Sequence, residues 1–110
     1  MKLAVIGSRN LVIEDLGDYV SQEVTEIVSG GAKGIDCCAA EFARSRGLKL
    51  TEFLPEYQVY GRAAPIKRNE RIVDYADEVL AFWDGESKGT LSAIKYCEKT
   101  NVPCRIITCI

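Results

Sequence analysis

Three glycines, a lysine and an aspartate stand in the stretch IVSGGAKGID, directly behind a short apolar run. Glycine permits positive φ angles and close backbone approach, and the amides at a helix start carry a partial positive charge. Gly30, Gly31 and Gly34 around Lys33 therefore predict either a tight turn or an anion site made of backbone amides. Asp36 would cap the following helix or accept a hydrogen bond from a ribose hydroxyl. The spacing matches neither GxGxxG nor GxxxxGK[ST].

Three further loops carry similar side chains. GSRN (7–10) combines a hydroxyl, a guanidinium and an amide. In KRNER (67–71), Arg68 has the planar geometry that suits bidentate phosphate contact, although such cations also form solvated helix faces. DGESKGT (84–90) begins a helix whose first turn is either capped by Ser87 or Thr90 or left open to a phosphate. The candidate ligand-binding residues are Gly7, Ser8, Arg9, Gly30, Gly31, Lys33, Gly34, Asp36, Arg68, Asn69, Ser87, Gly89 and Thr90.

These loops follow apolar runs that alternate with helical patterns. The patterns predict strands at 2–7, 25–30, 48–55, 78–83 and 104–110, and helices at about 15–23, 35–47, 66–75 and 90–99. Such alternation is typical of an α/β fold, here a three-layer Rossmann-like sandwich with a parallel sheet of about five strands. Ligands of such sheets bind beyond the carboxyl ends of the strands, so we expect the loops to meet at one edge.

Length and composition limit the classes of function. The 110 residues predict a single domain, residues 1–110. A net charge of −2 and a pI of about 5.2 disfavour nucleic acid as a partner and give no attraction to acidic membranes. With no long apolar run and no signal-like start, we expect a cytoplasmic protein without membrane contact. The five cysteines stand in apolar segments and predict reduced, buried thiols. The lack of histidine removes histidine triads and His-based metal sites, and we expect neither a metal nor a cofactor.

The combination of SGGAKGID, RN, AD before an apolar strand, and S-x-GT resembles the SLOG superfamily. This Rossmann-like group contains the DNA-processing protein DprA/Smf, the LOG nucleotide phosphoribohydrolases and small stand-alone YspA-like proteins. The resemblance is strongest to the YspA-like branch, which shares GGAKGID, RN and FWDG-S-GT, and it runs from Lys2 to about Ile107. It implies a pocket for a nucleotide or nucleotide-derived ligand, a sensor or accessory role, and a homodimer, because the superfamily often pairs through helices.

Two other functions of the superfamily are alternatives. LOG enzymes cleave the N-glycosidic bond of a nucleotide, using an arginine and the motif PGGxGTxxE. Arg68 matches that arginine, but Ala93 stands where the motif has its glutamate. Whether the protein is an enzyme therefore stays open, with Arg68 and Asp84 as catalytic candidates; Asp36, Glu70 and Glu86 are weaker substitutes for the missing carboxylate.

DprA-like binding of single-stranded DNA is the second alternative. It needs a basic groove with stacking aromatic rings. Tyr57, Tyr60 and Trp83 are predicted near the sheet edge, although a tryptophan at a strand end is more often part of the core. Because the chain is acidic, these rings suit one nucleotide better than a strand of DNA. The loop at 55–65 would form either a lid or a packed surface segment.

Overall fold

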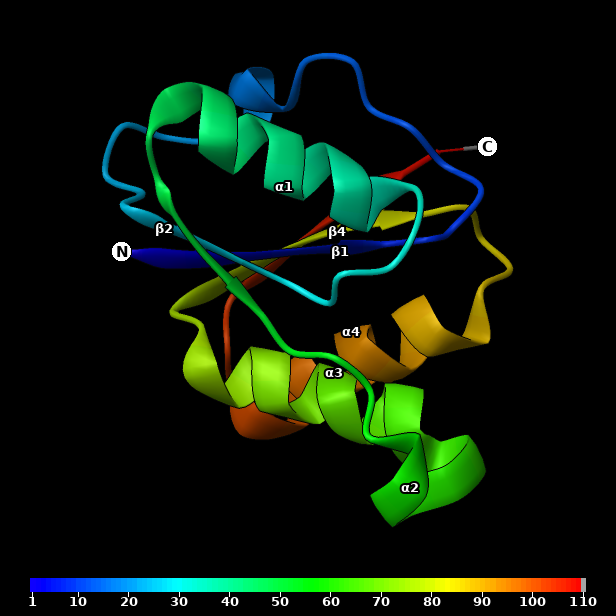
Figure 1. The fold of residues 1–110 in the computed structure, drawn as a ribbon. Helices are drawn as coiled ribbons and strands as arrows, with labels where there is room; N and C mark the ends of the chain where they lie inside the picture. The colour runs from blue at the N-terminus through cyan, green and yellow to red at the C-terminus, as the bar shows by residue number, and fades with distance from the viewer. Residues whose placement is uncertain (110) are drawn as a thin grey trace.

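The computed structural model describes residues 1–109 and contains a five-stranded, all-parallel sheet (Figure 1). The strand order is β3-β2-β1-β4-β5, which confirms the predicted α/β three-layer sandwich. The expected fifth strand extended to Ile110, which lies outside the described residues. The strands are β1 (Lys2–Gly7), β2 (Glu26–Ser29), β3 (Lys49–Glu52), β4 (Glu78–Trp83) and β5 (Cys104–Thr108).

Helices cover both faces of the sheet. In Figure 1, α1 (Ile35–Arg46) and the 3₁₀ turn η1 (Leu16–Tyr19) lie above the sheet, whereas α3 (Ala64–Tyr75) and α4 (Lys88–Thr100) lie below it. The short helix α2 (Tyr57–Tyr60) and the 3₁₀ turn η2 (Gly61–Ala63) lead from β3 into α3. The segment 55–65 is therefore largely helical and continues directly into α3.

Local sequence signals explain where the long helices begin and end. Gly47 takes a left-handed conformation after α1, and its amide bonds the carbonyls of Ala43 and Arg44. Pro65 stands in the first turn of α3, where its fixed φ is favourable, and this helix begins before the predicted Ile66. Ser87 caps α4, which begins at Lys88 and not at the predicted Thr90.

The predicted helix at 15–23 is wrong, because the segment forms only the turn η1. The Asp15 carboxylate accepts a hydrogen bond of 3.1 Å from the Gly17 amide and so starts a tight turn. Glycine and β-branched Val20 both disfavour a longer helix. Leu16 still packs against the core that lies under α1, so a single turn is enough to bury the apolar side chain.

The two central strands supply the core. Residues of β1 and β4 alternate between two apolar layers, one under α1 and one against α3 and α4. Phe82 lies in the first layer and Ala81 in the second. Among residues 1–109, no helix has both the length and the apolar character needed to cross a membrane.

The cysteines are all free, but the prediction that they are buried holds for one of them. Cys97 is buried in the layer beside α3 and α4. Cys37 is exposed, because it points outward from the first turn of α1, and Cys38, Cys104 and Cys109 are half-buried. Apolar neighbours in the sequence do not show whether a residue lies on the buried or the exposed face of a helix, and Cys37 lies on the exposed face of α1.

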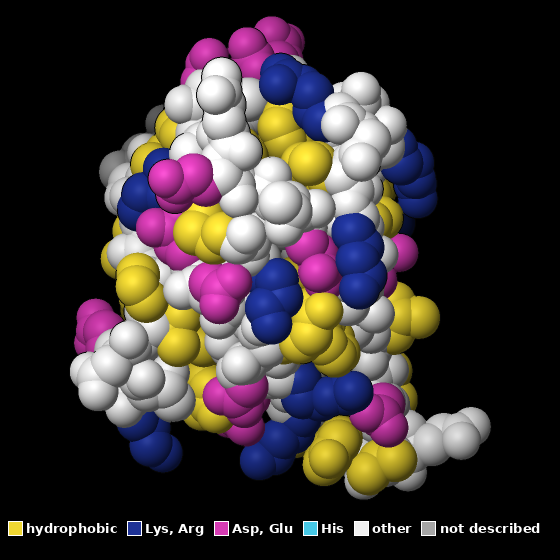
Figure 2. Space-filling model, turned by 90° about the vertical axis from the view of Figure 1, so that its left-hand side faces the viewer, with side chains coloured by type: hydrophobic (Ala, Val, Ile, Leu, Met, Phe, Trp, Pro, Cys, Tyr) yellow, Lys and Arg dark blue, Asp and Glu magenta, His cyan; other side chains and the backbone are white. Residues whose placement is uncertain are grey.

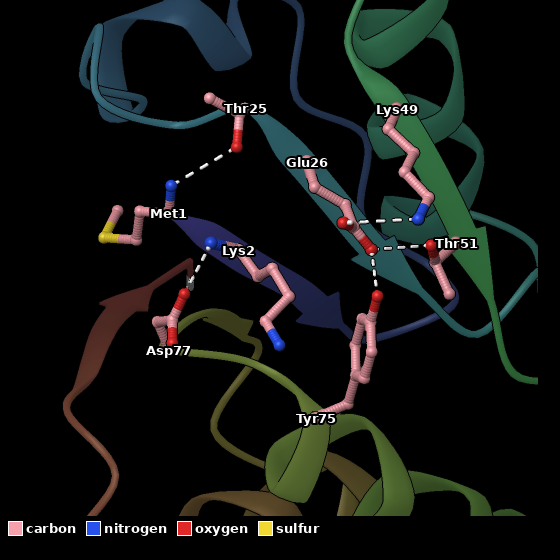
Figure 3. Close-up of polar contacts among 8 residues, drawn as sticks. All are labelled: Met1, Lys2, Thr25, Glu26, Lys49, Thr51, Tyr75 and Asp77. Atoms are coloured by element: carbon pink, nitrogen blue, oxygen red, sulfur yellow. Dashed lines mark hydrogen bonds and ion pairs between the residues drawn. The ribbon is translucent and has the colours of Figure 1, made fainter.

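A polar cluster joins the elements at the amino ends of the strands (Figure 3). Glu26, at the start of β2, accepts hydrogen bonds from the Thr51 hydroxyl at 2.7 Å and the Tyr75 hydroxyl at 2.6 Å. Burial raises the pKa of Glu26, but these hydrogen bonds and the charge of Lys49 outweigh it and hold the pKa below 4.5. Figure 2 shows this end of the molecule, where acidic, basic and apolar side chains are interspersed.

Candidate functional site

A cleft of about 370 Å³ opens at the carboxyl ends of β1 and β4. Chain connectivity reverses between these two strands, since β2 and β3 extend the sheet on one side of β1 and β4 and β5 extend it on the other. Crevices at such points are the usual ligand sites of open parallel sheets. The cleft is lined by Ile6, Gly7, Ser8, Arg9, Asn10, Ala32, Asp36, Pro65, Arg68, Asn69, Ile72, Asp84, Ser87, Gly89 and Thr90.

A smaller cavity of about 310 Å³, here called the side cavity, adjoins the cleft. It lies between the loops that follow β2 and β3, and it shares Arg9, Ala32 and Arg68 with the cleft. Its lining residues are Arg9, Gly30, Gly31, Ala32, Lys33, Leu54, Pro55, Tyr57 and Arg68.

The structure divides the predicted ligand-binding residues between these two hollows. Gly7, Ser8, Arg9, Asp36, Arg68, Asn69, Ser87, Gly89 and Thr90 line the cleft, whereas Gly30, Gly31 and Lys33 line the side cavity. Gly34 lines neither of them. Its φ is +71°, and a Cβ there would collide with the carbonyls of Arg9 and Leu11. Gly34 therefore allows the loops after β1 and β2 to pack against each other.

The loop after β1 is fixed by Ser8, which is 2% exposed. Its amide donates to the Phe82 carbonyl at 3.1 Å, and its hydroxyl accepts from the Asp84 amide at 3.4 Å. These bonds tie the carboxyl end of β1 to that of β4. Arg9 follows on the exposed side of the turn and lines both the cleft and the side cavity.

Asp36 does not cap α1, which was one of the two roles predicted for it, because the capping position belongs to Gly34 and Asp36 lies within the first turn. Its carboxylate instead accepts the Ala32 amide at 3.1 Å and so orders the loop before the helix. Burial raises the pKa of Asp36, which is only partly offset by the Ala32 amide and the positive charge of Arg68. The site thus holds a carboxylate close to a buried guanidinium.

Arg68 is the most buried cation of the site, at 7% exposure. Its Nη1 donates to the Gly30 carbonyl at 2.7 Å and to the Phe53 carbonyl at 3.4 Å, and its Nε donates to the Asn69 side chain at 2.8 Å. Its Nη2 donates to none of the residues that the structure describes. Burial lowers the pKa of Arg68, whereas the charge of Asp36 raises it; an arginine stays protonated under such shifts.

The other two cations of KRNER point elsewhere. Lys67 pairs with Glu70 at 3.8 Å, and Arg71 pairs with Glu56 at 2.7 Å and lies over the Phe53 ring. Neither lines the cleft or the side cavity. The solvated-face interpretation therefore holds for these two, and Arg68 alone of the three faces the site.

The start of α4 forms the far wall of the cleft. The Ser87 hydroxyl accepts the Thr90 amide at 3.4 Å, which decides between the two predicted caps in favour of Ser87. Asp84 accepts the amides of Glu86 and Ser87 at 2.9 and 2.8 Å. The hydrogen bond from the Ser87 amide has the larger effect on the pKa of Asp84, and that from the Glu86 amide adds to it. Both lower this pKa, so the carboxylate is ionised at neutral pH. Trp83 is half-buried beside the apolar core, and its indole donates to the Ser87 carbonyl at 3.0 Å.

Ala93 lies away from the cleft. It is 1% exposed and packs in the apolar layer between α4 and the sheet. A glutamate at this position would need space that the core occupies here. Among residues 1–109, no cluster of three or more carboxylates and thiols is arranged to hold a metal ion.

Five lining residues of the cleft were not among the predicted site residues: Ile6, Asn10, Ala32, Pro65 and Ile72. The sequence does contain a signal that could have found two of these residues, Pro65 and Ile72. Positions 65, 68, 69 and 72 follow the spacing of one helix face, so the face that carries Arg68 also carries Pro65 and Ile72. Ala32 carries no such signal, because it lies in the glycine-rich loop.

No protein-family model matches this chain, and a search of curated proteins finds no significant relative. The resemblance to the SLOG superfamily therefore stays a prediction from the motifs.

Proposed function

We propose that this protein binds a nucleotide or a nucleotide-derived phosphate ligand in the cleft, as a SLOG-type sensor or accessory module. The observation that carries the proposal is Arg68, a buried guanidinium whose Nη2 has no hydrogen-bond partner among the described residues. It lines a cleft at the point where the strand order reverses. Nη2 therefore stays free to donate to a ligand in this cleft, and a guanidinium whose other nitrogens are held in place favours an anionic ligand.

The walls of the cleft suit a phosphate and a sugar. The amides of Lys88 and Gly89, at the start of α4, have no hydrogen-bond partner among residues 1–109, and a helix start attracts anions. Arg9 supplies a second guanidinium to the cleft, and it forms no ion pair with any residue of the described chain. Asp36 and Asp84 would accept hydrogen bonds from ribose hydroxyls. Together these groups match a nucleoside monophosphate.

A second candidate function is hydrolysis of an N-glycosidic bond. One observation favours it: Asp84 is an ionised carboxylate in the same cleft as Arg68. Such a charge stabilises the oxocarbenium-like state that forms as the base departs. A sensor is favoured over this enzyme because Asp84 is already bound by two loop amides and Ala93 replaces the glutamate of the LOG motif.

Binding is tested by thermal unfolding with a panel of nucleoside monophosphates and ribose 5-phosphate. A ligand at 100 times its Kd adds about 2.7 kcal/mol to the free energy of unfolding, which raises the Tm by roughly 10 °C in a domain of this size. Arg9→Ala should weaken binding by about 10-fold, because a charge-assisted hydrogen bond is lost. Arg62→Ala is the matched control, since Arg62 is exposed and lines neither hollow. If no member of the panel raises the Tm at millimolar concentration, the proposal is wrong.

Hydrolysis is tested by release of free base from the same monophosphates. Release that disappears in Asp84→Asn, while binding persists, would establish the enzyme and replace the sensor. Binding without any release over long incubation would support the sensor.

A further inference from the structure

The side cavity differs from the cleft in charge. Three cations line it, Arg9, Lys33 and Arg68, and no carboxylate does. The cleft holds two of these cations together with Asp36 and Asp84. Neither Arg9 nor Lys33 forms an ion pair within residues 1–109. Arg9 and Arg68 therefore lie at the boundary between the two hollows. Lys33 lies on the side-cavity side, where the Glu52 carboxylate is close to Gly31 without lining the cavity.

The outer wall of the side cavity is apolar and exposed. Leu54 is 62% exposed and Tyr57 is 56% exposed, with Pro55 between them. Leu54 also lies against Gly31, where the absence of a side chain makes room for it. A tyrosine ring that stands open beside a cationic pocket offers a surface on which a planar ring can stack.

Arg68 and Arg9 link the two hollows, because both residues line both of them. Through its Nη1, Arg68 is held by the carbonyls that follow β2 and β3, so its guanidinium stays at the boundary. Its Nη2 is the nitrogen that no described residue bonds. Two guanidinium groups at a shared boundary match the charge of a diphosphate, with room for an organic group on each side.

We infer that the side cavity is a second subsite for the same ligand, and that the preferred ligand is a diphosphate-bridged dinucleotide. This inference rests on the proposed function. The diphosphate lies across Arg9 and Arg68, one nucleoside occupies the cleft, and the base of the other stacks on Tyr57. Each hollow alone is at the lower end of the volumes typical of small-molecule sites, and a two-part ligand would use both.

Calorimetric titration with matched ligands tests the inference. The probes are AMP, ADP and diadenosine diphosphate, together with GMP, GDP and diguanosine diphosphate. The dinucleotides are symmetrical, so the direction of binding does not affect the comparison. In one of the two series, the dinucleotide should bind at least about 5-fold more tightly than the nucleoside diphosphate, because stacking of one base contributes about 5- to 150-fold in affinity.

Tyr57→Ala should remove this advantage and leave the affinity for the mononucleotide unchanged. Tyr60→Ala is the matched control: Tyr60 stands on the same short helix, is exposed, and does not line the side cavity. An unchanged Tm in both variants shows that the fold is intact.

Four results overturn the inference. If a mononucleotide binds and its dinucleotide binds no more tightly, the second subsite is absent while the proposed function stands. If Tyr57→Ala weakens both ligands equally, Tyr57 does not act on the second base. If none of the six probes binds while another member of the monophosphate panel does, the inference is wrong and the proposed function stands. If no member of either set binds, the proposed function fails and the inference fails with it.

Discussion

The Arg68 guanidinium occupies the space into which a side chain at Gly30 would project, and it bonds the Gly30 carbonyl at 2.7 Å. A glycine at position 30 is thus needed for packing, since the space beside it belongs to another residue. Gly30 does not have a positive φ, so conformational freedom is not the reason for the glycine.

Gly30→Ala should therefore destabilise the protein by about 1 to 3 kcal/mol, the usual cost of overpacking a buried position. The free energy of unfolding in urea measures this. Gly89→Ala is the control, because a Cβ there meets no heavy atom within 4 Å and alanine favours the helix. An equal loss in both variants would show that Arg68 is not the cause.

Ser87→Ala should cost about 1 kcal/mol of stability, because the Thr90 amide at the start of α4 loses its acceptor. Chemical denaturation gives the difference. Ser45→Ala removes an exposed hydroxyl that donates to the Phe42 carbonyl, and we expect a change of about 0.5 kcal/mol or less. If Ser45→Ala lowers the free energy of unfolding more than Ser87→Ala does, the Ser87 cap does not contribute significantly to stability.

Glu26→Gln should destabilise the protein at pH 7 by about 1 to 2 kcal/mol, because two hydrogen bonds to a carboxylate weaken. The folded-state pKa of Glu26 is lowered, so its contribution is present above the ordinary pKa of 4.5 and is lost as the pH falls through the folded-state value. The gap between wild type and Glu26→Gln should therefore close below pH 4.5.

Unfolding curves at pH 7, 5 and 3.5 measure this gap. Glu23→Gln, at an exposed position, is the control and should show little gap at any of these values. A gap that widens toward low pH would contradict the assignment of the lowered pKa to Glu26.

Cys37 should react with a thiol reagent in the folded protein well before the other cysteines, because it is the exposed one. Cys97 should react only on unfolding, since it is buried in the core. Mass spectrometry of the labelled peptides identifies the order. Early labelling of Cys97 would mean that α4 opens readily.

The sequence predicted the sheet well, because buried parallel strands appear as apolar runs such as EVLAFW. It predicted the helix at 15–23 wrongly, because a few apolar residues at helical spacing are equally satisfied by one 3₁₀ turn. The loops at the cleft could be located, since each follows a strand. The side cavity could not, because it depends on how the segment at 54–57 approaches Gly31 and Lys33, which no local pattern records.

The sequence pattern also could not predict which cation of the motif KRNER faces the site. Lys67, Arg68 and Arg71 belong to one short motif, yet one is buried and two are paired on the surface. Which of them faces the sheet depends on the rotation of α3 against β2 and β3.

The bond from Arg68 to the Gly30 carbonyl joins residues that are 38 positions apart in the chain. Arg68 lines both hollows, so neither hollow forms until α3 has packed against the carboxyl ends of β2 and β3. A partly folded chain therefore has no binding site. A ligand that binds at Arg68 would therefore stabilise the protein against unfolding of the whole molecule. The amides of α1, α3 and the central strands exchange by such global unfolding, and we expect them to gain protection together when the ligand binds.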